Sequence, residues 1–287
     1  MSRRKFCAAL AAFLLAPGAF APATARAAGR PLRIGLTPVF LDEQAAFLEA
    51  WRAYLERRLG QPVEFAQRGS YREIVDLLGR EKLDAAWLCG YPYVRYERAL
   101  KLVAVPLYQG KPLYRSYLIA PAAAASISGL ADLRGKVFAY SDPLSNSGFL
   151  YPQYRLAQMG ERAEAFFSRT FFTWTHRKVV EAVAVGMAQG GAVDGYIWDT
   201  LARIRPELTE KTRVVEMSPA FGFPPLVARA SLLDGEVAAL RRVLLSMGEN
   251  DEGRSLLGQL NLDGFTAGDR ALYDEIGRMA RVVGGSL

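Results

Sequence analysis

The sequence predicts an α/β protein with two lobes that are joined by two hinge crossings. Strand-like and helix-like segments alternate from residue 31 onward, and this order is typical of a mostly parallel sheet with helices on both faces. Two stretches, 121–135 and 221–225, interrupt the alternation, and each lies beside an extended segment. A middle lobe inserted into a discontinuous first lobe explains both interruptions. We therefore expect a first lobe of residues 29–119 and 225–287 and a second lobe of residues 120–224.

The elements expected in the first lobe follow from the spacing of apolar residues. Phe47, Trp51, Leu55 and Leu59 recur at every fourth position, which predicts one face of a helix. Short apolar runs between turn residues predict strands. We expect strands at 32–38, 62–68, 83–89, 103–108, 114–120 and 226–230, and helices at 42–59, 71–80, 91–100, 236–247, 251–260 and 269–283.

The second lobe is expected to repeat the alternation on a smaller scale. Two α/β lobes joined by two crossings enclose a cleft at the carboxyl ends of their strands, where open α/β folds bind ligands. We expect strands at 136–141, 193–198 and 212–217, and helices at 147–159 and 177–189.

The first 28 residues predict a cleaved signal peptide, so the protein is expected to be exported. A basic start, Ser-Arg-Arg-Lys-Phe at 2–6, precedes an apolar run at 7–21 and small-residue cleavage sites at 23–27. The apolar run is too short to span a membrane. The paired arginines resemble a twin-arginine signal, and an ordinary Sec signal is the alternative.

The net charge and the cysteine content limit the classes of function that the protein can have. The net charge is +7, but four of the positive charges lie in the first 28 residues, which hold no acid, so the exported chain keeps only +3. Nothing in it resembles a nucleic-acid-binding patch. Cys7 lies in the signal peptide, so Cys89 is the only thiol of the exported chain and no internal disulfide forms. Such a thiol is either buried or functional.

A cluster of small polar residues stands at a strand-to-helix junction. Ser145, Asn146 and Ser147 are followed by Gly148 and a helix-like segment. A helix start carries unpaired backbone N–H groups and a partial positive charge, so donors gathered there suit a tetrahedral oxyanion. Simple helix capping is the alternative, because serine and asparagine are favoured caps.

Two further residues are candidates for the same site. His176, the only histidine, precedes a second helix, where it is either structural or a donor to the same anion. Asp199 follows the expected strand 193–198 and is either a surface cap or a carboxylate that points into the cleft. A carboxylate accepts a hydrogen bond from an oxyanion that keeps a proton, such as phosphate, phosphite or a phosphonate, and it disfavours sulfate.

Three motifs together resemble one family. They are SDPLSNSGFLYP at 141–152, SYREIVDLLGREKLDAAW at 70–87, and the single histidine followed by VVEAVAVG. With these motifs the sequence resembles, over residues 31–264, the periplasmic phosphonate-, phosphite- and phosphate-binding proteins of ABC importers. The resemblance implies a type II periplasmic binding protein fold and a monomer in the periplasm. It implies an ABC permease in the inner membrane as partner, and neither a cofactor nor catalysis. The ligand-binding residues that it implies are Tyr71, Tyr114, Ser145, Asn146, Ser147, His176 and, less securely because the spacing differs, Asp199.

The departures from the family pattern refine these expectations. Where relatives that take aminoalkylphosphonates carry an acid, this chain has Phe223 and Pro224, so a small oxyanion without an amino group is expected. Cys89 is also unusual. Some relatives are periplasmic arsenite sensors that work with a sensor kinase, and a thiol that lines the cleft binds soft trivalent arsenic. An arsenite- or oxyanion-sensing subunit that uses Cys89 is therefore the alternative function.

A hydrolase is the remaining possibility, with Ser147, His176 and Asp199 as a triad. The chain has no G-x-S-x-G elbow around a serine and no spacing typical of metal ligands. We therefore expect neither an enzyme nor a metal site.

Overall fold

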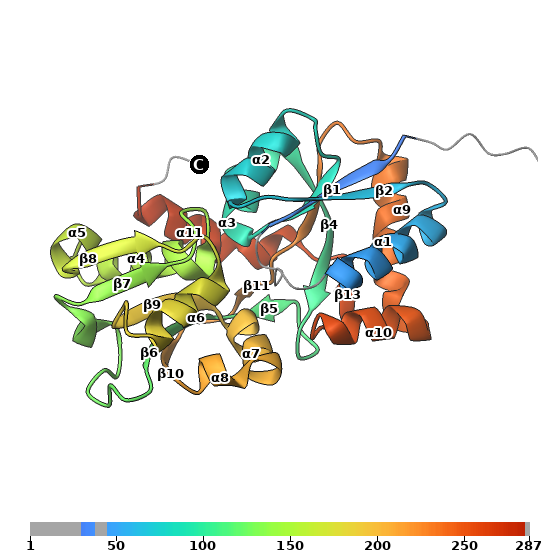
Figure 1. Cartoon of the computed structure of the whole chain (residues 1–287). Helices are drawn as coiled ribbons and strands as arrows, with labels where there is room; N and C mark the ends of the chain where they lie inside the picture. Colours follow the sequence, from blue (N-terminus) through green and yellow to red (C-terminus); the bar gives the residue numbers. More distant parts are fainter. Residues whose placement is uncertain (1–29, 38–44, 285–287) are drawn as a thin grey trace, which may run out of the picture.

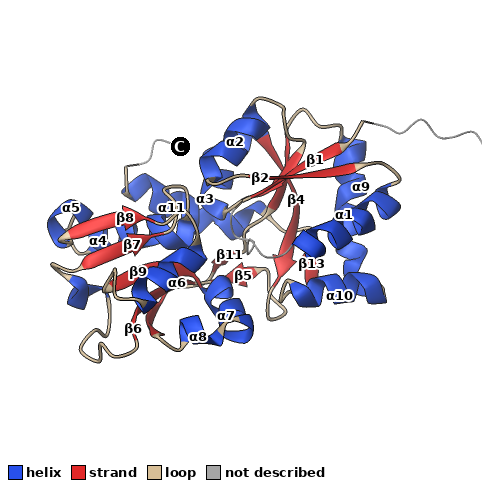
Figure 2. Cartoon of the chain, in the orientation of Figure 1, coloured by secondary structure: helices blue, strands red, loops and turns tan. Residues whose placement is uncertain are grey.

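The computed structural model describes residues 30–37 and 45–284 and shows two lobes, each built on its own β-sheet (Figure 1). The expected signal peptide at 1–28, with Cys7, lies outside the described residues. Figure 2 shows the strands gathered into two groups, with helices around each of them.

The sheet of the first lobe contains strands from both ends of the chain. Its order is β13-β4-β12-β3-β1-β2. The strand β1 pairs in parallel with β2 and β3, whereas β12 runs antiparallel to β3 and β4, and β13 runs antiparallel to β4. The bounds are β1 Leu32–Leu36, β2 Val63–Gln67, β3 Ala85–Trp87, β4 Leu100–Leu107, β12 Leu226–Arg229 and β13 Gly264–Thr266.

The sheet of the second lobe has the order β10-β6-β9-β7-β8. The strand β7 pairs in parallel with β8 and β9, and β6 pairs antiparallel with β9 and β10. A two-stranded antiparallel ribbon, β5 Leu113–Tyr114 with β11 Phe221–Gly222, lies between the two sheets (Figure 1). The other bounds are β6 Ser116–Pro121, β7 Val137–Tyr140, β8 Arg169–Phe172, β9 Gly190–Asp194 and β10 Thr212–Met217.

Helices cover both sheets. In the first lobe, α1 buries the predicted apolar residues Phe47, Trp51 and Leu55, while Leu59 stays half-buried. The last helix, α11, contacts both α3 and α4. The helices are α1 Ala45–Leu59, α2 Tyr71–Gly79, α3 Gly90–Arg95, α4 Tyr151–Gln158, α5 Ala163–Phe166, α6 His176–Ala184, α7 Gly195–Ile204, α8 Pro206–Thr209, α9 Asp234–Leu245, α10 Asp251–Gln259 and α11 Asp274–Val282. Single turns of 3-10 helix lie at Glu97–Ala99, Leu130–Leu133, Ser246–Glu249 and Arg270–Tyr273, and a π-helical turn at Asn146–Leu150 precedes α4.

The two-lobed α/β prediction is confirmed, but several details differ. Both sheets are mixed rather than mostly parallel, because β12, β13, β6 and β10 return antiparallel to their neighbours. The strand β8 and the short helix α5 were not predicted. The lobe boundaries at 119/120 and 224/225 remain predictions, and β6 crosses the first of them.

The predicted strand at 193–198 is wrong. The strand β9 ends at Asp194, and α7 begins at Gly195. The apolar, β-favouring residues of this stretch suggested a strand. However, Ile197 and Leu201 lie four residues apart on the buried side of a helix, and the Asp194 side chain caps it by accepting a hydrogen bond from the Tyr196 N–H.

Candidate ligand-binding site between the lobes

Polar side chains from both lobes meet between the two sheets. Ser145, Asn146 and Ser147 follow β7, and His176 is the first residue of α6 in the same lobe. Tyr71, the first residue of α2, comes from the other lobe. We call the following residues, all of them buried, the donor cluster: Tyr71, Cys89, Tyr114, Ser145, Asn146, Ser147 and His176.

A hydrogen bond to the backbone fixes the protonation of His176. Its Nδ1 accepts a hydrogen bond from the Asp194 N–H at 3.0 Å, so the proton of the neutral ring lies on Nε2. The Nε2 atom lies 3.3 Å from the Tyr71 hydroxyl and 3.5 Å from Ser145 Oγ. Burial lowers the pKa of His176 to about 3, so the ring is neutral. His176 therefore offers an uncharged N–H to the centre of the cluster.

The three residues after β7 have different roles. Ser145 is a helix cap, because its Oγ accepts a hydrogen bond from the Gly148 N–H at 2.9 Å. The Asn146 amide Nδ2 donates to the Tyr114 hydroxyl at 2.9 Å. The Oδ1 of Asn146 and the Oγ atoms of Ser147 and nearby Ser141 are buried without a hydrogen-bond partner. Buried polar atoms are almost always paired, so capping explains Ser145 alone.

Cys89 is part of the cluster. Its Sγ accepts a hydrogen bond from the Asn146 backbone N–H at 3.2 Å. Burial raises the pKa of the thiol to about 11, so the group is uncharged. The sulfur atom thus pairs with the first backbone N–H of the π-helical turn.

Gly148 permits the close packing of this region. A Cβ atom at this position would lie 1.9 Å from Ser141 Oγ and 3.1 Å from His176 Cε1. The glycine therefore allows β7 and α6 to approach the turn that carries Ser147.

Asp199 lies outside the donor cluster, and its role in ligand binding stays a prediction. It lies inside α7, and its Oδ2 accepts hydrogen bonds from the hydroxyls of Tyr108 at 2.7 Å and Tyr117 at 3.1 Å. The carboxylate that does end the strand is Asp194, which is buried. The prediction named Asp199 because it placed the end of the strand too late in the sequence.

Asp142 is a second carboxyl group that the sequence reasoning missed. It is buried, and it accepts hydrogen bonds from the N–H groups of Tyr71 at 3.0 Å and Leu144 at 2.7 Å. The first of these bonds joins the second lobe to the N-terminus of α2. Burial raises the pKa of Asp142. Its place at the start of the motif SDPLSNSG was the signal that could have identified it.

Neutral groups dominate the remaining surroundings. Among the described residues, no lysine or arginine side chain makes a hydrogen bond or ion pair with a member of the donor cluster. Phe223 is buried, with its ring 5.8 Å from that of Tyr114 and 5.0 Å from that of Tyr196. Aromatic rings therefore pack at the position where relatives that take aminoalkylphosphonates were expected to carry an acid.

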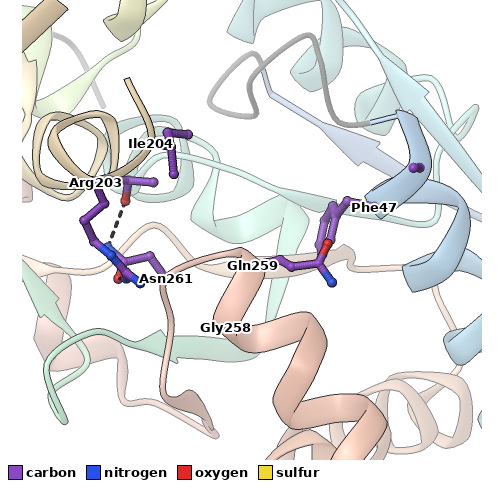
Figure 3. A pocket seen from close by; sticks show the side chains of 8 residues that line it. Phe47, Arg203, Ile204, Gly258, Gln259 and Asn261 are labelled. Carbon is purple, nitrogen blue, oxygen red and sulfur yellow. Dashed lines mark hydrogen bonds between the residues drawn. The ribbon is translucent and has the colours of Figure 1, made fainter. Parts of the chain in front are cut away.

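Two cavities flank the contact between the lobes. One of about 310 Å³ is lined by the four tyrosines Tyr108, Tyr114, Tyr117 and Tyr196, among other residues. The other, of about 370 Å³, lies between α1, α7 and α10 and is lined by Phe47, Arg203, Ile204, Gly258, Gln259 and Asn261 (Figure 3). Neither includes the serines of the donor cluster.

The described part of the chain shows neither a metal centre nor a membrane-spanning helix. No group of three or more His, Cys, Asp or Glu side chains within residues 30–37 and 45–284 is placed to hold a metal ion. No helix in these ranges combines the length and apolar character needed to cross a membrane.

Comparison with known sequences identifies relatives. The chain is 32% identical to the phosphate-import protein PhnD of Mycolicibacterium smegmatis over 158 residues, which are 51% of this chain and 48% of that protein. It therefore matches about half the length of that relative. It is 25% identical to the phosphonates-binding periplasmic protein of Escherichia coli over 256 residues, 86% of this chain and 75% of that protein.

Solved structures share the fold. A binding protein component of an ABC phosphonate transporter from Pseudomonas aeruginosa matches with a TM-score of 0.82 and 24% identity, covering 88% of this chain and 86% of that one. PhnD1 of Prochlorococcus marinus, in complex with methylphosphonate, matches with a TM-score of 0.80 and 18% identity, covering 89% of this chain and 98% of that one.

A family model described as "ABC transporter, phosphonate, periplasmic substrate-binding protein" matches residues 34–273. This is a family of solute-binding proteins that catalyse no reaction, which confirms that the chain is not an enzyme. The chain thus belongs to the periplasmic substrate-binding proteins of phosphonate ABC transporters, as its motifs predicted, and has their two-lobed α/β fold.

Proposed function

We propose that this protein binds a small phosphorus oxyanion, namely phosphate, phosphite or a small phosphonate, and delivers it to the permease of an ABC importer. The observation that carries this proposal is that the buried side-chain oxygens of Asn146 and Ser147 have no hydrogen-bond partner. These oxygens belong to the same cluster as the N–H of His176. A bound oxyanion supplies acceptors for the hydroxyl of Ser147 and the His176 N–H, and its own O–H can reach Asn146 Oδ1.

The chemistry of the cluster favours a guest that is small and partly protonated. All its donors are neutral, so affinity arises from hydrogen bonds in a buried site rather than from ion pairs. The wall formed by Phe223 provides no carboxylate for an alkylammonium group. The names of the two curated relatives support the same guest class, since one is a phosphate-import protein and the other binds phosphonates.

Calorimetric titration tests the proposal. We expect the exported form of the protein to bind at least one of phosphate, phosphite and methylphosphonate with a Kd below about 1 mM, which corresponds to roughly −4 kcal/mol. Sulfate should bind more weakly. The variant His176→Gln should lose at least tenfold in affinity, whereas Asp132→Asn, in an exposed turn of the second lobe, should bind like the wild type. The absence of binding by all three phosphorus compounds would exclude the proposal.

A second candidate function rests on Cys89. Because its thiol lies in the donor cluster, 3.2 Å from the Asn146 nitrogen, it is placed to react with arsenous acid. The thiol then forms an S–As bond, and one hydroxyl group leaves with the thiol proton as water. The protein would in that case present arsenite to a sensor kinase. Replacing Cys89 with serine should abolish arsenite binding and leave phosphorus-oxyanion binding within about threefold, or about 0.6 kcal/mol; unchanged arsenite binding would rule this function out.

Export and assembly belong to the same proposal. We expect a monomer in the periplasm after removal of residues 1–28, and size-exclusion chromatography of the exported form checks the monomer. Cell fractionation of the double variant Arg3→Lys, Arg4→Lys distinguishes the routes, because twin-arginine export should stop and Sec export should continue.

A further inference from the structure

Asp194 occupies a distinctive place next to the donor cluster. It is the last residue of β9 and pairs across the sheet with Ser116 on β6. The Ser116 hydroxyl donates to the backbone oxygen of Ser147 at 2.7 Å. On its other side, the Asp194 N–H holds the ring of His176. Asp194 therefore contacts His176 directly and is connected to Ser147 through Ser116.

The carboxyl group of Asp194 is buried without a positive partner. It is only 2% exposed, and no lysine or arginine among the described residues forms an ion pair with it. Its hydrogen bonds come from the backbone at the start of α7, including the Tyr196 N–H at 2.9 Å. Burial raises its pKa to about 8. An unpaired carboxylate in such a site is costly, so a proton on or near it stabilises the structure.

The charge of Asp194 acts on the cluster itself. Burial is the main cause that raises the pKa of Tyr71, and the charges of Cys89, Asp142 and Asp194 raise it further. Burial and then the charges of Cys89 and Asp194 act in the same way on Tyr114. Asp194 thus lies within electrostatic range of hydroxyl groups from both walls of the site.

We propose that Asp194 is the specificity-determining residue of the donor cluster and that its carboxyl group and the bound guest hold one proton between them. This inference rests on the proposed function, and it specifies the protonation state in which the guest binds. A guest that keeps an O–H donates it to the carboxylate. A fully ionised guest accepts the hydrogen bond from the protonated carboxyl group. Both arrangements contain the same proton, because two like charges that share a buried site do not both remain ionised.

Two consequences follow for the choice of guest. An oxyanion that keeps a proton near neutral pH satisfies Asp194 by itself, and this is true of phosphate, phosphite and phosphonates. Sulfate does not, so its binding depends entirely on a proton held by Asp194 and weakens as the pH rises. Above the pH at which both partners are ionised, each guest takes up one proton from solution when it binds.

Other titratable groups surround Asp194, and the experiment must separate them from it. His176 is the main rival, because an anion beside its ring can also draw a proton onto it. The titratable groups that contact Asp194 or interact with its charge are Tyr71 on α2, Cys89 before α3, Tyr114 on β5, Tyr117 on β6, His176 on α6, and Tyr196 and Asp199 on α7.

Proton uptake during binding tests the proposal. The tightest-binding of phosphate, phosphite and methylphosphonate is titrated into the exported protein at pH 9.5 in two buffers of different ionisation enthalpy. We expect the wild type to take up close to one proton per guest and its affinity to fall about tenfold per pH unit above this pH. Asp194→Asn keeps the cap on α7 but cannot exchange a proton, so its uptake should fall near zero and its affinity should become almost independent of pH.

Controls make each outcome decisive. Asp199→Asn, on the helix that Asp194 caps, should take up the same number of protons as the wild type even if its affinity is lower. If Asp194→Asn does not fold, Asp194→Ser offers another capping side chain without a titratable group. Uptake that persists in the Asp194 variants assigns the proton to His176 and overturns the proposal, as does a wild type that takes up no proton. If none of the three guests binds the wild type, the proposed function itself has failed.

Discussion

The same two lobes are joined by two regions of opposite character. In the donor cluster, the Oδ1 of Asn146 and the Oγ of Ser147 are buried without partners. Along α7, polar groups are paired: the Tyr196 hydroxyl donates to the Leu260 oxygen at 2.5 Å, and the Asn261 amide donates to Thr200 Oγ1 at 3.0 Å. Leaving a buried polar group unpaired costs about 1–3 kcal/mol. The comparison teaches that the α7 contact is complete as protein, whereas the donor cluster keeps buried oxygens that the proposed guest would pair.

Variants in the two regions should therefore behave differently. Changes at the unpaired oxygens of Asn146 and Ser147 should reduce guest binding with little loss, or even a gain, of stability in the guest-free protein. Changes along α7 should reduce stability, and they should affect the affinity for every guest by the same factor, because they act on lobe closure rather than on recognition.

The largest effect is expected for Gly148→Ala. The added Cβ would lie 1.9 Å from Ser141 Oγ, so β7 and α6 must move away from the turn that carries Ser147. Overpacking of this kind costs about 1–3 kcal/mol of stability. We expect calorimetry to show a loss of guest affinity of about 100-fold, or about 2.7 kcal/mol.

The matched control is Gly79→Ala. Gly79 ends α2, the helix that begins with Tyr71, and a Cβ there meets nothing within 4 Å. Alanine favours the helix over glycine by about 0.5–1 kcal/mol, so this variant should be slightly more stable and should bind the guest normally. Equal affinities of the two variants would show that the packing around Gly148 does not shape the site.

The second effect is a pH dependence of the guest-free protein. Burial raises the pKa of Asp194 to about 8 and lowers that of His176 to about 3. The folded protein keeps a proton on Asp194 that the unfolded chain releases above about pH 4, so stability falls as the pH rises toward 8. The unfolded chain protonates His176 below about pH 6.5 and the folded protein does not, so this term lowers stability as the pH drops.

The two terms oppose each other between about pH 4 and pH 6.5, the ordinary pKa values of the two side chains. We therefore expect nearly constant stability in this range and a loss of about 1 kcal/mol per pH unit from there to pH 8. Urea unfolding at three pH values measures it. The variant Asp194→Asn should remove the loss above pH 6.5, and an equal loss in the variant would assign the pH dependence to other groups.

The sequence predicted the architecture and part of the site because these depend on local signals. The Ser-Asn-Ser junction and His176 each stand at a helix start after a strand, and parallel strands such as β7 and β8 bring such junctions to one edge of a sheet. The structure indeed places them together with Tyr71 and Tyr114. Their role in binding a guest remains a prediction.

Local sequence signals could not show which aspartate carboxyl groups lie near the donor cluster. Asp194 and Asp199 are five residues apart, and the choice between them depended on where one strand ended. The stretch after Asp194 is rich in residues that favour strands, and the tertiary packing of Tyr196 and Ile197 decides for a helix. The contact between Asp142 and the Tyr71 N–H joins segments 71 residues apart across two lobes, and no local pattern reveals such a contact.

The third effect compares two serines in contact. Ser147→Ala removes a buried hydroxyl without a partner, so the guest-free protein should gain up to about 1 kcal/mol while guest affinity falls about tenfold. Ser116→Ala removes a hydroxyl that donates to the Ser147 oxygen at 2.7 Å, so stability should fall by about 1 kcal/mol. Urea unfolding and calorimetry measure both quantities. A loss of stability in both variants would mean that the Ser147 hydroxyl is already paired in solution.

The smallest effect distinguishes two tyrosines that share one acceptor. The hydroxyls of Tyr108, which follows β4 in the first lobe, and Tyr117, on β6 in the second, both donate to Asp199 Oδ2. Replacing either with phenylalanine removes one hydrogen bond and should cost about 0.5–1.5 kcal/mol in urea unfolding. Only the Tyr108 bond crosses between the lobes, so only Tyr108→Phe should weaken guest binding, by about fivefold or ~1 kcal/mol. An equal loss of affinity in Tyr117→Phe would show that the tyrosines act by orienting α7, and that the paired interface contributes to recognition as well as to closure.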